Sequence, residues 1–186
     1  MKKALYLLLF ICSFTFPSRA QYILSSKNAT VSFFSGTVME DIEGKSNTAS
    51  SVIDPKTRNI IFKVSNTSFQ FQKKLMQEHF NEDYMESDRY PFSKFSGRIT
   101  DELDFNKDGN YNLTVEGTLQ IHGVTKPWSC RVAMIISNGV VTAKSVFKIK
   151  IEDYQIKIPS LVFKNIAEYV EVRLSAVYQP TKTITK

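Results

Sequence analysis

The longest alternation of apolar and polar residues in the chain runs from Tyr111 to His122. Its odd positions carry Tyr, Leu, Val, Gly, Leu and Ile, whereas its even positions are polar throughout. Side chains of a strand point to opposite faces in turn, so this pattern predicts a strand with one dry face and one wet face. A strand usually has about 5–6 residues, and the greater length here favours a barrel or a strongly coiled sheet.

Shorter segments repeat this alternation and predict further strands. Their apolar positions are Ile60, Phe62 and Val64; Val132, Met134 and Ile136; Phe147, Ile149 and Ile151; and Val170, Val172, Leu174, Ala176 and Tyr178. Asn138-Gly139 stands between two of these patterns and predicts a two-residue hairpin turn. From Tyr154 onward the apolar positions are even-numbered, which predicts a bulge or tight bend near Glu152-Asp153.

One segment has helical spacing instead. Apolar residues between Phe71 and Tyr84 recur on one side of a helix, and no β-branched residue interrupts them. We predict a short helix of about two or three turns, with its apolar side against the sheet. Many antiparallel strands with polar outer faces, together with this helix, predict an all-β fold that is either a sandwich or a closed barrel.

The chain opens with a charged and then apolar segment typical of export. Two lysines precede an apolar run from Ala4 to Phe16, and small residues stand at the −3 and −1 positions of a cleavage site after Ala20. This pattern predicts a secretory signal peptide over residues 1–20. No later segment reaches the ~18 consecutive apolar residues of a membrane helix. We therefore predict a periplasmic or secreted bacterial protein without a transmembrane segment after cleavage.

Removal of the signal peptide changes the charge and the cysteine content. It takes away Lys2, Lys3 and Arg19 and no acidic residue, so the formal charge falls from +6 to +3. Such a small charge on an exported chain argues against nucleic-acid binding. Cys130 is then a single cysteine, which we interpret as a buried thiol on a strand, with an intermolecular or reactive thiol as the alternative.

No group of residues in the sequence indicates catalysis or a metal site. Residues 104–109 match the first half of an EF-hand loop, but its twelfth position is Val115 and a strand follows, which favours a polar turn. His79 and His122 are the only histidines and lack metal-ligand spacing. A Ser nucleophile motif is also missing. We predict a protein without catalytic residues, metal or cofactor; a hydrolase that uses His79 or His122 is the weakest alternative.

Aromatic residues exceed what a minimal core needs. The chain has 14 Phe, and aromatic residues make up 12% of it. A barrel of about eight strands either fills its interior with side chains or holds one small ligand. An apolar interior suits a lipid, because each buried methylene gains about 0.8 kcal/mol. The residues alone leave both interiors open.

Three segments resemble one known family. The first runs from Met76-Gln77-Glu78-His79-Phe80-Asn81-Glu82 through Tyr90-Pro91-Phe92 to Phe95-Ser96-Gly97. The second leads from Gly109 into Gly117-Thr118-Leu119-Gln120-Ile121-His122-Gly123-Val124-Thr125-Lys126, and the third is Val170-Glu171-Val172-Arg173-Leu174. Together they are similar to the YceI-like family of secreted lipid- and polyisoprenoid-binding proteins. The resemblance spans residues 21–179, whereas the polar segment 37–51 departs from the family's early strands.

The Thr- and Lys-rich residues 180–186 predict a flexible tail. The resemblance implies an extended antiparallel, lipocalin-like β-barrel of about eight strands over residues 21–179. Its lumen would hold a long isoprenoid or fatty chain, and no catalytic residue is implied. His122 and Lys126 would either close the strand end or meet the ligand's head group at the rim. We predict that the ligand's tail contacts Phe33, Phe62, Leu75, Met76, Phe80, Phe92, Leu113, Val115, Leu119, Phe147, Val172 and Leu174.

A non-enzymatic carrier of a long-chain amphiphile is therefore the expected function. The main alternative is a ligand-free, filled barrel that acts as an interaction module in envelope stress or redox assembly. The sequence leaves open which lipid is bound and whether the barrel forms a homodimer.

Overall fold

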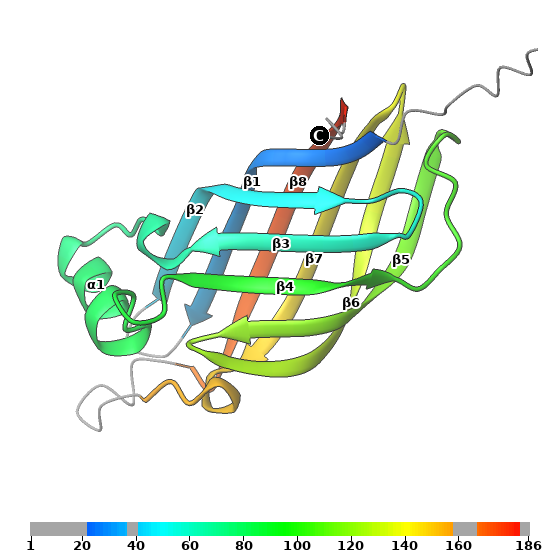
Figure 1. Ribbon diagram of the computed structural model, residues 1–186. Coiled ribbons are helices and arrows are strands. Elements are labelled where there is room, and N and C mark those ends of the chain that lie inside the picture. The colour runs from blue at the N-terminus through cyan, green and yellow to red at the C-terminus, as the bar shows by residue number, and fades with distance from the viewer. Residues whose placement is uncertain (1–21, 37–40, 158–166, 183–186) are drawn as a thin grey trace, which may run out of the picture.

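The computed structural model describes residues 22–36, 41–157 and 167–182, and its strands form a closed antiparallel barrel (Figure 1). Each strand pairs with its neighbours in the sequence, and the last pairs with the first. The eight strands are β1 Tyr22–Gly36, β2 Asp41–Ile53, β3 Asn59–Ser65, β4 Phe92–Ile99, β5 Gly109–Ile121, β6 Val124–Ser137, β7 Val140–Lys150 and β8 Tyr169–Lys182. This confirms the predicted barrel, while the predicted signal peptide and its cleavage site lie outside the described residues.

Strand β5 shows why the alternation predicted the fold well. Leu113, Val115 and Leu119 are all at most 8% exposed, and the polar residues between them face outward. Every residue of β5 pairs with a residue of β6. The two strands join through His122-Gly123, whose φ angles of 49° and 73° form the tight turn of a two-residue hairpin. A Cβ atom at Gly123 would collide with the Tyr90 ring, so the turn requires glycine there.

Strand β2 lies where no strand was predicted from the residue pattern. Its inward side carries Gly44, Ser46, Ala49 and Ser51, which are buried although none is a large apolar residue. Small residues are needed because rings from elsewhere fill this part of the interior. A Cβ atom at Gly44 would lie 2.5 Å from the Phe33 ring. The inner face of β2 is therefore set by its neighbours and not by its own hydrophobicity.

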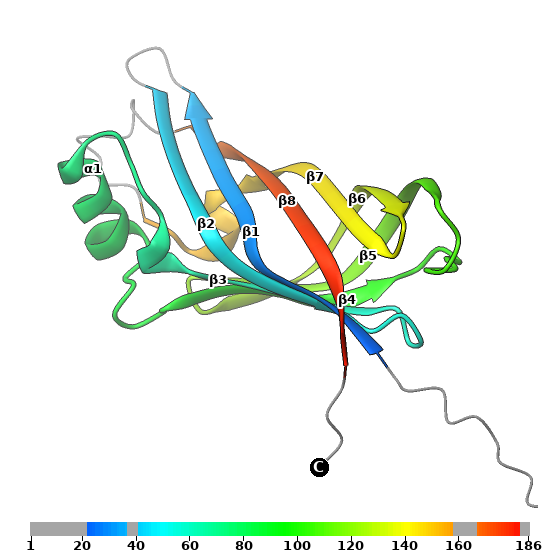
Figure 2. The same ribbon diagram turned by 90° about the horizontal axis from the view of Figure 1, so that it is seen from above.

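The half of the barrel away from the helix is filled by deeply buried apolar side chains. Leu24, Ile53, Met134, Ile136 and Tyr178 are each at most 2% exposed and belong to one continuous core. Strands β1 and β8, which carry the two ends of the described chain, lie side by side and close the barrel here (Figure 2).

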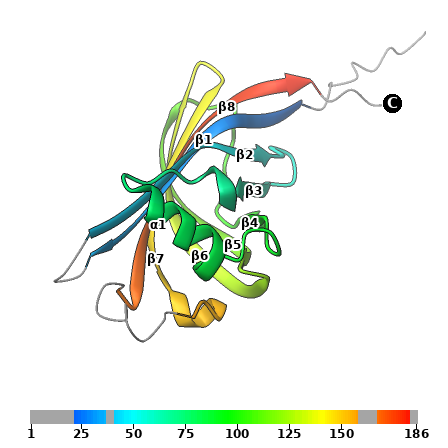
Figure 3. The ribbon, with the colours of Figure 1, turned by 90° about the vertical axis from the view of Figure 1, so that its left-hand side faces the viewer.

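At the opposite end the strands separate in two places. Strand β2 pairs with β3 only over Ser50–Ile53, and β6 pairs with β7 only over Ala133–Ser137. Two connecting segments fill these gaps and lie at the same end of the barrel (Figure 3). We call residues 66–90 the helical plug, which contains η1 (Asn66–Ser68), α1 (Lys74–His79) and η2 (Phe80–Tyr84). We call residues 151–157 the η3 plug, after the 3₁₀ turn η3 (Ile151–Tyr154).

Three boundaries differ from those that the sequence predicts. The predicted helix begins at Lys74 rather than Phe71, and its second half is a π-helical turn. The tight bend near Glu152-Asp153 is confirmed as η3, but no described residue beyond it continues β7 as a strand. Strand β8 runs through Pro180 to Lys182, so the barrel extends into the predicted tail.

The loop at residues 104–109 is the polar turn that the sequence favoured. The backbone N–H and the side chain of Asn106 both donate to Asp104, and Asp108 accepts from the backbone N–H of Asn138. These bonds use the Asp side chains to hold the turn. Among the described residues no cluster of His, Cys, Asp and Glu has the arrangement of a metal site.

Candidate binding cavity

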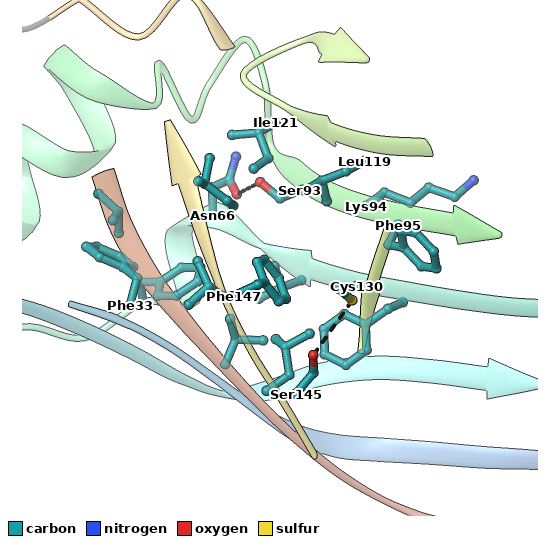
Figure 4. A pocket seen from close by; sticks show the side chains of 18 of the residues that line it. Phe33, Asn66, Ser93, Lys94, Phe95, Leu119, Ile121, Cys130, Ser145 and Phe147 are labelled. Atoms are coloured by element: carbon teal, nitrogen blue, oxygen red, sulfur yellow. Dashed lines mark hydrogen bonds between the residues drawn. The ribbon is translucent and has the colours of Figure 1, made fainter. Parts of the chain in front are cut away.

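Between the packed half of the barrel and the two plugs lies a cavity of about 250 Å³ (Figure 4). Its wall combines inward-facing residues of the strands with residues of both plugs. Aliphatic and aromatic side chains make up most of it, from Val31 on β1 to Tyr178 on β8. The volume approaches the lower limit of about 300 Å³ for pockets that hold drug-sized ligands.

Phenylalanines form the end of the cavity beneath the helical plug. The Phe33 ring lies 5.5 Å from Phe69, 5.7 Å from Phe71 and 5.4 Å from Phe80, measured between ring centroids. Phe71 and Phe80 lie 5.0 Å apart. Most of these pairs are tilted or edge-on, the geometries that aromatic quadrupoles favour. The cluster fixes the helical plug on β1 and gives the ligand space an aromatic wall.

The polar groups of the wall are largely satisfied by the protein itself. The Asn66 side chain is fully buried, donates to the Tyr90 carbonyl at 2.6 Å and accepts from the Ser93 hydroxyl at 2.9 Å. The Ser145 hydroxyl donates to the Arg131 carbonyl at 2.6 Å where β6 and β7 begin to separate. These bonds hold both groups against the protein, and the rest of the wall offers mainly apolar contact.

Cys130 lies on the wall of the cavity on β6, as Figure 4 shows, and is half-buried. Burial raises the pKa of its thiol, while the Ser145 hydroxyl, 3.7 Å from the sulfur, and the Trp128 indole lower it. A thiol whose pKa is raised reacts slowly, because the thiolate is the nucleophile. The structure thus supports the interpretation of Cys130 as a strand residue that packs inward.

Nine of the twelve predicted tail contacts lie on the cavity wall. They come from strands on opposite sides of the barrel and from the helical plug, and the structure brings them around one space. They are Phe33, Phe62, Met76, Phe80, Val115, Leu119, Phe147, Val172 and Leu174.

Three predicted tail contacts do not lie on the wall. Leu75 is 61% exposed, because it stands on the solvent side of α1. Phe92 is 43% exposed at the start of β4, and its ring lies under the Lys63 ammonium at 3.5 Å. Leu113 does face inward, but it belongs to the packed half of the barrel below the cavity. The alternation predicted correctly that Leu113 faces the interior, but it could not predict where along the barrel axis the cavity lies.

His122 and Lys126, the predicted head-group residues, are both engaged with the protein. The His122 ring approaches the Tyr154 carbonyl at 3.2 Å and the Glu86 carboxylate at 3.1 Å, and its side chain is only 10% exposed. The Lys126 ammonium lies 2.8 Å from Asp153. Neither residue lines the cavity. The structural interpretation of these residues therefore describes them better than a head-group site does.

Several wall residues escaped the sequence analysis. Trp128 and Cys130 continue the even-numbered alternation of β6 backwards from Val132, a signal that Pro127 and Lys126 obscure. Phe69 and Ile156 lie in the plugs, where no strand or helix period applies. Of these four residues, only Trp128 and Cys130 could have been predicted, by extending the alternation of β6 toward its start.

Comparison with known proteins agrees with this geometry. The model of the YceI-like domain matches residues 22–178. The chain belongs to the YceI-like family. None of the helices in the described parts of the chain is long and apolar enough to span a membrane. A comparison with the curated proteins gives no match.

Solved structures with the same fold have low sequence identity to this YceI-like chain. A polyisoprenoid-binding domain from Saccharophagus degradans is 14% identical, with a TM-score of 0.72 over 88% of this chain and 100% of that domain. Burkholderia cenocepacia BcnA is 20% identical, with a TM-score of 0.68 over 80% of this chain and 95% of BcnA. The Campylobacter jejuni YceI protein is 17% identical, with a TM-score of 0.59 over 75% and 85% of the two chains. These likenesses establish the fold.

Proposed function

We propose that the protein is an exported, non-enzymatic carrier of a long-chain amphiphile, an isoprenoid or a fatty chain, held in the barrel cavity. The observation that carries this proposal is the mainly apolar wall, in which the polar side chains of Asn66 and Ser145 are already bonded to the protein. A hydrocarbon chain gains about 0.8 kcal/mol per methylene on leaving water and needs no polar partner. A sugar or nucleotide would lose its bonds to water without replacement.

Two further features support the proposal. The Saccharophagus degradans structure with the same fold is described as a polyisoprenoid-binding domain, and the cavity here has the apolar character that such a ligand needs. The signal-peptide pattern of residues 1–20 supports export. We assign no head-group contact to His122 or Lys126, because both would first have to leave their protein partners.

Native mass spectrometry with organic extraction tests the carrier function. The protein is secreted by a lipid-rich bacterial host and purified without detergent. We expect a stoichiometric adduct whose mass is that of an isoprenoid or a fatty chain. A ligand-free mass from a protein with a cooperative thermal transition would refute the carrier function and favour an interaction module.

A cavity-filling variant tests where the ligand lies. Ala143 faces the cavity from β7, so Ala143→Phe occupies the space with an apolar ring and adds no charge. We expect loss of the adduct. Val146→Phe on the same strand is the matched control, because Val146 is 61% exposed on the outer face. Retention of a full adduct by folded Ala143→Phe would contradict the cavity assignment.

A further inference from the structure

The η3 plug closes a lateral gap in the barrel wall. Beyond Ala133, β6 continues toward Val124 without a partner in β7, and β7 continues toward Lys150 without a partner in β6. Tyr154 and Ile156 of the plug pack against Trp128 of β6 and Ile149 of β7. The plug therefore stands where strand-to-strand hydrogen bonds would otherwise seal the cavity.

His122 fastens this plug to the rest of the barrel. Its Nδ1 lies 3.2 Å from the Tyr154 carbonyl of the plug, and its Nε2 lies 3.1 Å from the Glu86 carboxylate of the helical plug. The ring also packs edge-on against Tyr90, 4.7 Å between centroids. Because His122 occupies the rigid β5–β6 turn, one side chain joins three segments that are far apart in the sequence.

The closed plug also buries a polar group without a partner. Among the described residues, the Tyr154 hydroxyl of the plug is buried and makes no hydrogen bond. The neighbouring Trp128 indole of β6 has only the Cys130 thiol near its nitrogen. A buried, unpaired hydroxyl forfeits its bonds to water, and outward movement of the plug would restore them. Closure is thus opposed by the Tyr154 hydroxyl and held by the His122 contacts.

We propose that the η3 plug is a lateral gate between β6 and β7, and that His122 is the latch that holds it closed. The gate moves outward to admit a hydrocarbon chain sideways into the cavity. That it passes a lipid rests on the proposed function, whereas opening of the gate is a property of the protein alone. The helical plug stays in place, because the backbones of Lys45 and Gln70 bond it to β2 at 3.0 and 2.8 Å.

Alkylation of Cys130 measures gate opening without any lipid. The thiol lines the cavity beside the gap, and peptide mass after exposure to N-ethylmaleimide reports its labelling rate. In His122→Asn the latch is lost, while asparagine tolerates the φ angle of 49°. We expect labelling about fivefold faster, the effect of losing one neutral hydrogen bond, here the bond to the Tyr154 carbonyl. Tyr154→Phe removes the unpaired hydroxyl from the closed plug, and we expect labelling several-fold slower.

Ser87→Ala is the matched control in the helical plug. It removes one buried hydrogen bond, from the Ser87 hydroxyl to the Asn81 side chain at 2.8 Å, and should leave the labelling rate within twofold of wild type. Acceleration by Ser87→Ala, or unchanged rates in both gate variants, would overturn the gate. Slower labelling of Tyr154→Phe cannot result from loss of the fold, so that variant tests the gate even if His122→Asn folds poorly. Labelling in urea well below the unfolding transition must show the same slowing at every urea concentration; a rate that follows the free energy of global unfolding would overturn the gate. A barrel with a working gate and no lipid adduct would refute the carrier function alone.

Discussion

The two plugs fill similar gaps at one end of the barrel, and they differ in how completely their polar groups are satisfied. The helical plug has a fully buried Asn66 with a donor and an acceptor bond, two backbone bonds to β2, and an aromatic cluster. The η3 plug buries the Tyr154 hydroxyl without a partner, and it has an exposed ion pair between Lys126 and Asp153. One plug is part of the core, and the other is fastened mainly by side chains at its edge.

Burial alone does not decide how readily a segment opens. Tyr154 is 2% exposed and Phe69 is 5% exposed, so these two side chains are buried to a similar extent. The free energy of opening depends on what each segment loses and recovers in water. On opening, the helical plug would lose paired groups, whereas the η3 plug would recover hydrogen bonds for the Tyr154 hydroxyl.

The largest expected effect comes from the aromatic cluster. Phe69→Ala removes a buried ring between Phe33 and Phe80, and we expect a loss of about 3–5 kcal/mol in the free energy of unfolding. Phe147→Ala should cost less, because Phe147 is only half-buried and borders the cavity. Urea unfolding of both variants measures the difference. Equal losses would show that the two ends of the cavity are packed alike.

The second-largest loss of stability is expected when the Asn66 amide is removed. Asn66→Ala leaves the Tyr90 carbonyl and the Ser93 hydroxyl without this partner, so we expect a loss of about 2–4 kcal/mol. Urea unfolding measures it, with the exposed Asn112→Ala as the control for loss of an amide. A cost for Asn66→Ala no larger than that of Asn112→Ala would contradict the role of this network.

Removing the hydroxyl groups of two buried tyrosines should change the free energy of unfolding in opposite directions. Tyr154→Phe removes an unpaired hydroxyl and should raise the free energy of unfolding by about 1 kcal/mol. Tyr178→Phe breaks the 2.8 Å bond between Tyr178 and Ser51 and should lower it by about 1 kcal/mol. Thermal or urea unfolding of the pair decides the sign. Destabilisation by both variants would mean that Tyr154 has a partner, which would remove the contrast between the plugs.

Alkaline titration tests whether the η3 plug is dry. Burial raises the pKa of Tyr178 to about 12, which the bond with Ser51 lowers only in part. Burial and the Asp153 charge raise the pKa of Tyr154 to about 12. Stability from these phenols is present below the ordinary pKa of 10.0 and is lost as the pH rises toward about 12, because the unfolded tyrosines ionise first.

The measurement is tyrosinate absorbance against pH for wild type and the two Tyr→Phe variants. Each variant should lose one of the two tyrosine ionisations expected near pH 12, and the tyrosinate absorbance should not differ among the three proteins at neutral pH. Ionisation of Tyr154 close to pH 10, before that of Tyr178, would show that water already reaches the η3 plug.

The smallest expected effect is that of the Lys126–Asp153 ion pair. Both side chains are about half exposed, and ion pairs of this kind contribute little to stability. The hydrogen bond from Lys126 lowers the pKa of the Asp153 carboxyl in the folded protein. The ion pair therefore contributes to stability at pH values above the ordinary pKa of an Asp carboxyl, and this contribution is lost as the pH falls through the lowered pKa of Asp153. At neutral pH, Asp153→Asn should therefore have the same urea midpoint of unfolding as the wild type. A clear shift would make the ion pair, rather than His122, the main fastening of the η3 plug.

The sequence predicted features that depend on local repetition. Alternation placed Val115 and Leu119 on the inner face of β5, and Asn138-Gly139 forms the expected hairpin turn with φ angles of 50° and 76°. The family motifs identified the fold, and the helical spacing found α1 and η2 within three residues. Most of the cavity wall followed from these faces.

Sequence patterns failed where the requirement comes from another part of the chain. Gly44 of β2 must be small because the Phe33 ring lies against it, and Leu75 faces water because it stands on the solvent side of α1. The motif residue His122 has two partners, Glu86 and Tyr154, that no spacing relates to it.

Alternating strands and an aromatic-rich interior followed from the residue pattern, and the family motifs selected the barrel over the sandwich. Which interior positions pack solid and which border a cavity was decided only by the closed barrel, because strands that are fully paired at one end separate at the other. The same separation created the two gaps and the plugs that fill them. A strand's period is a property of its own residues, whereas a gap between strands is a property of the whole closed sheet.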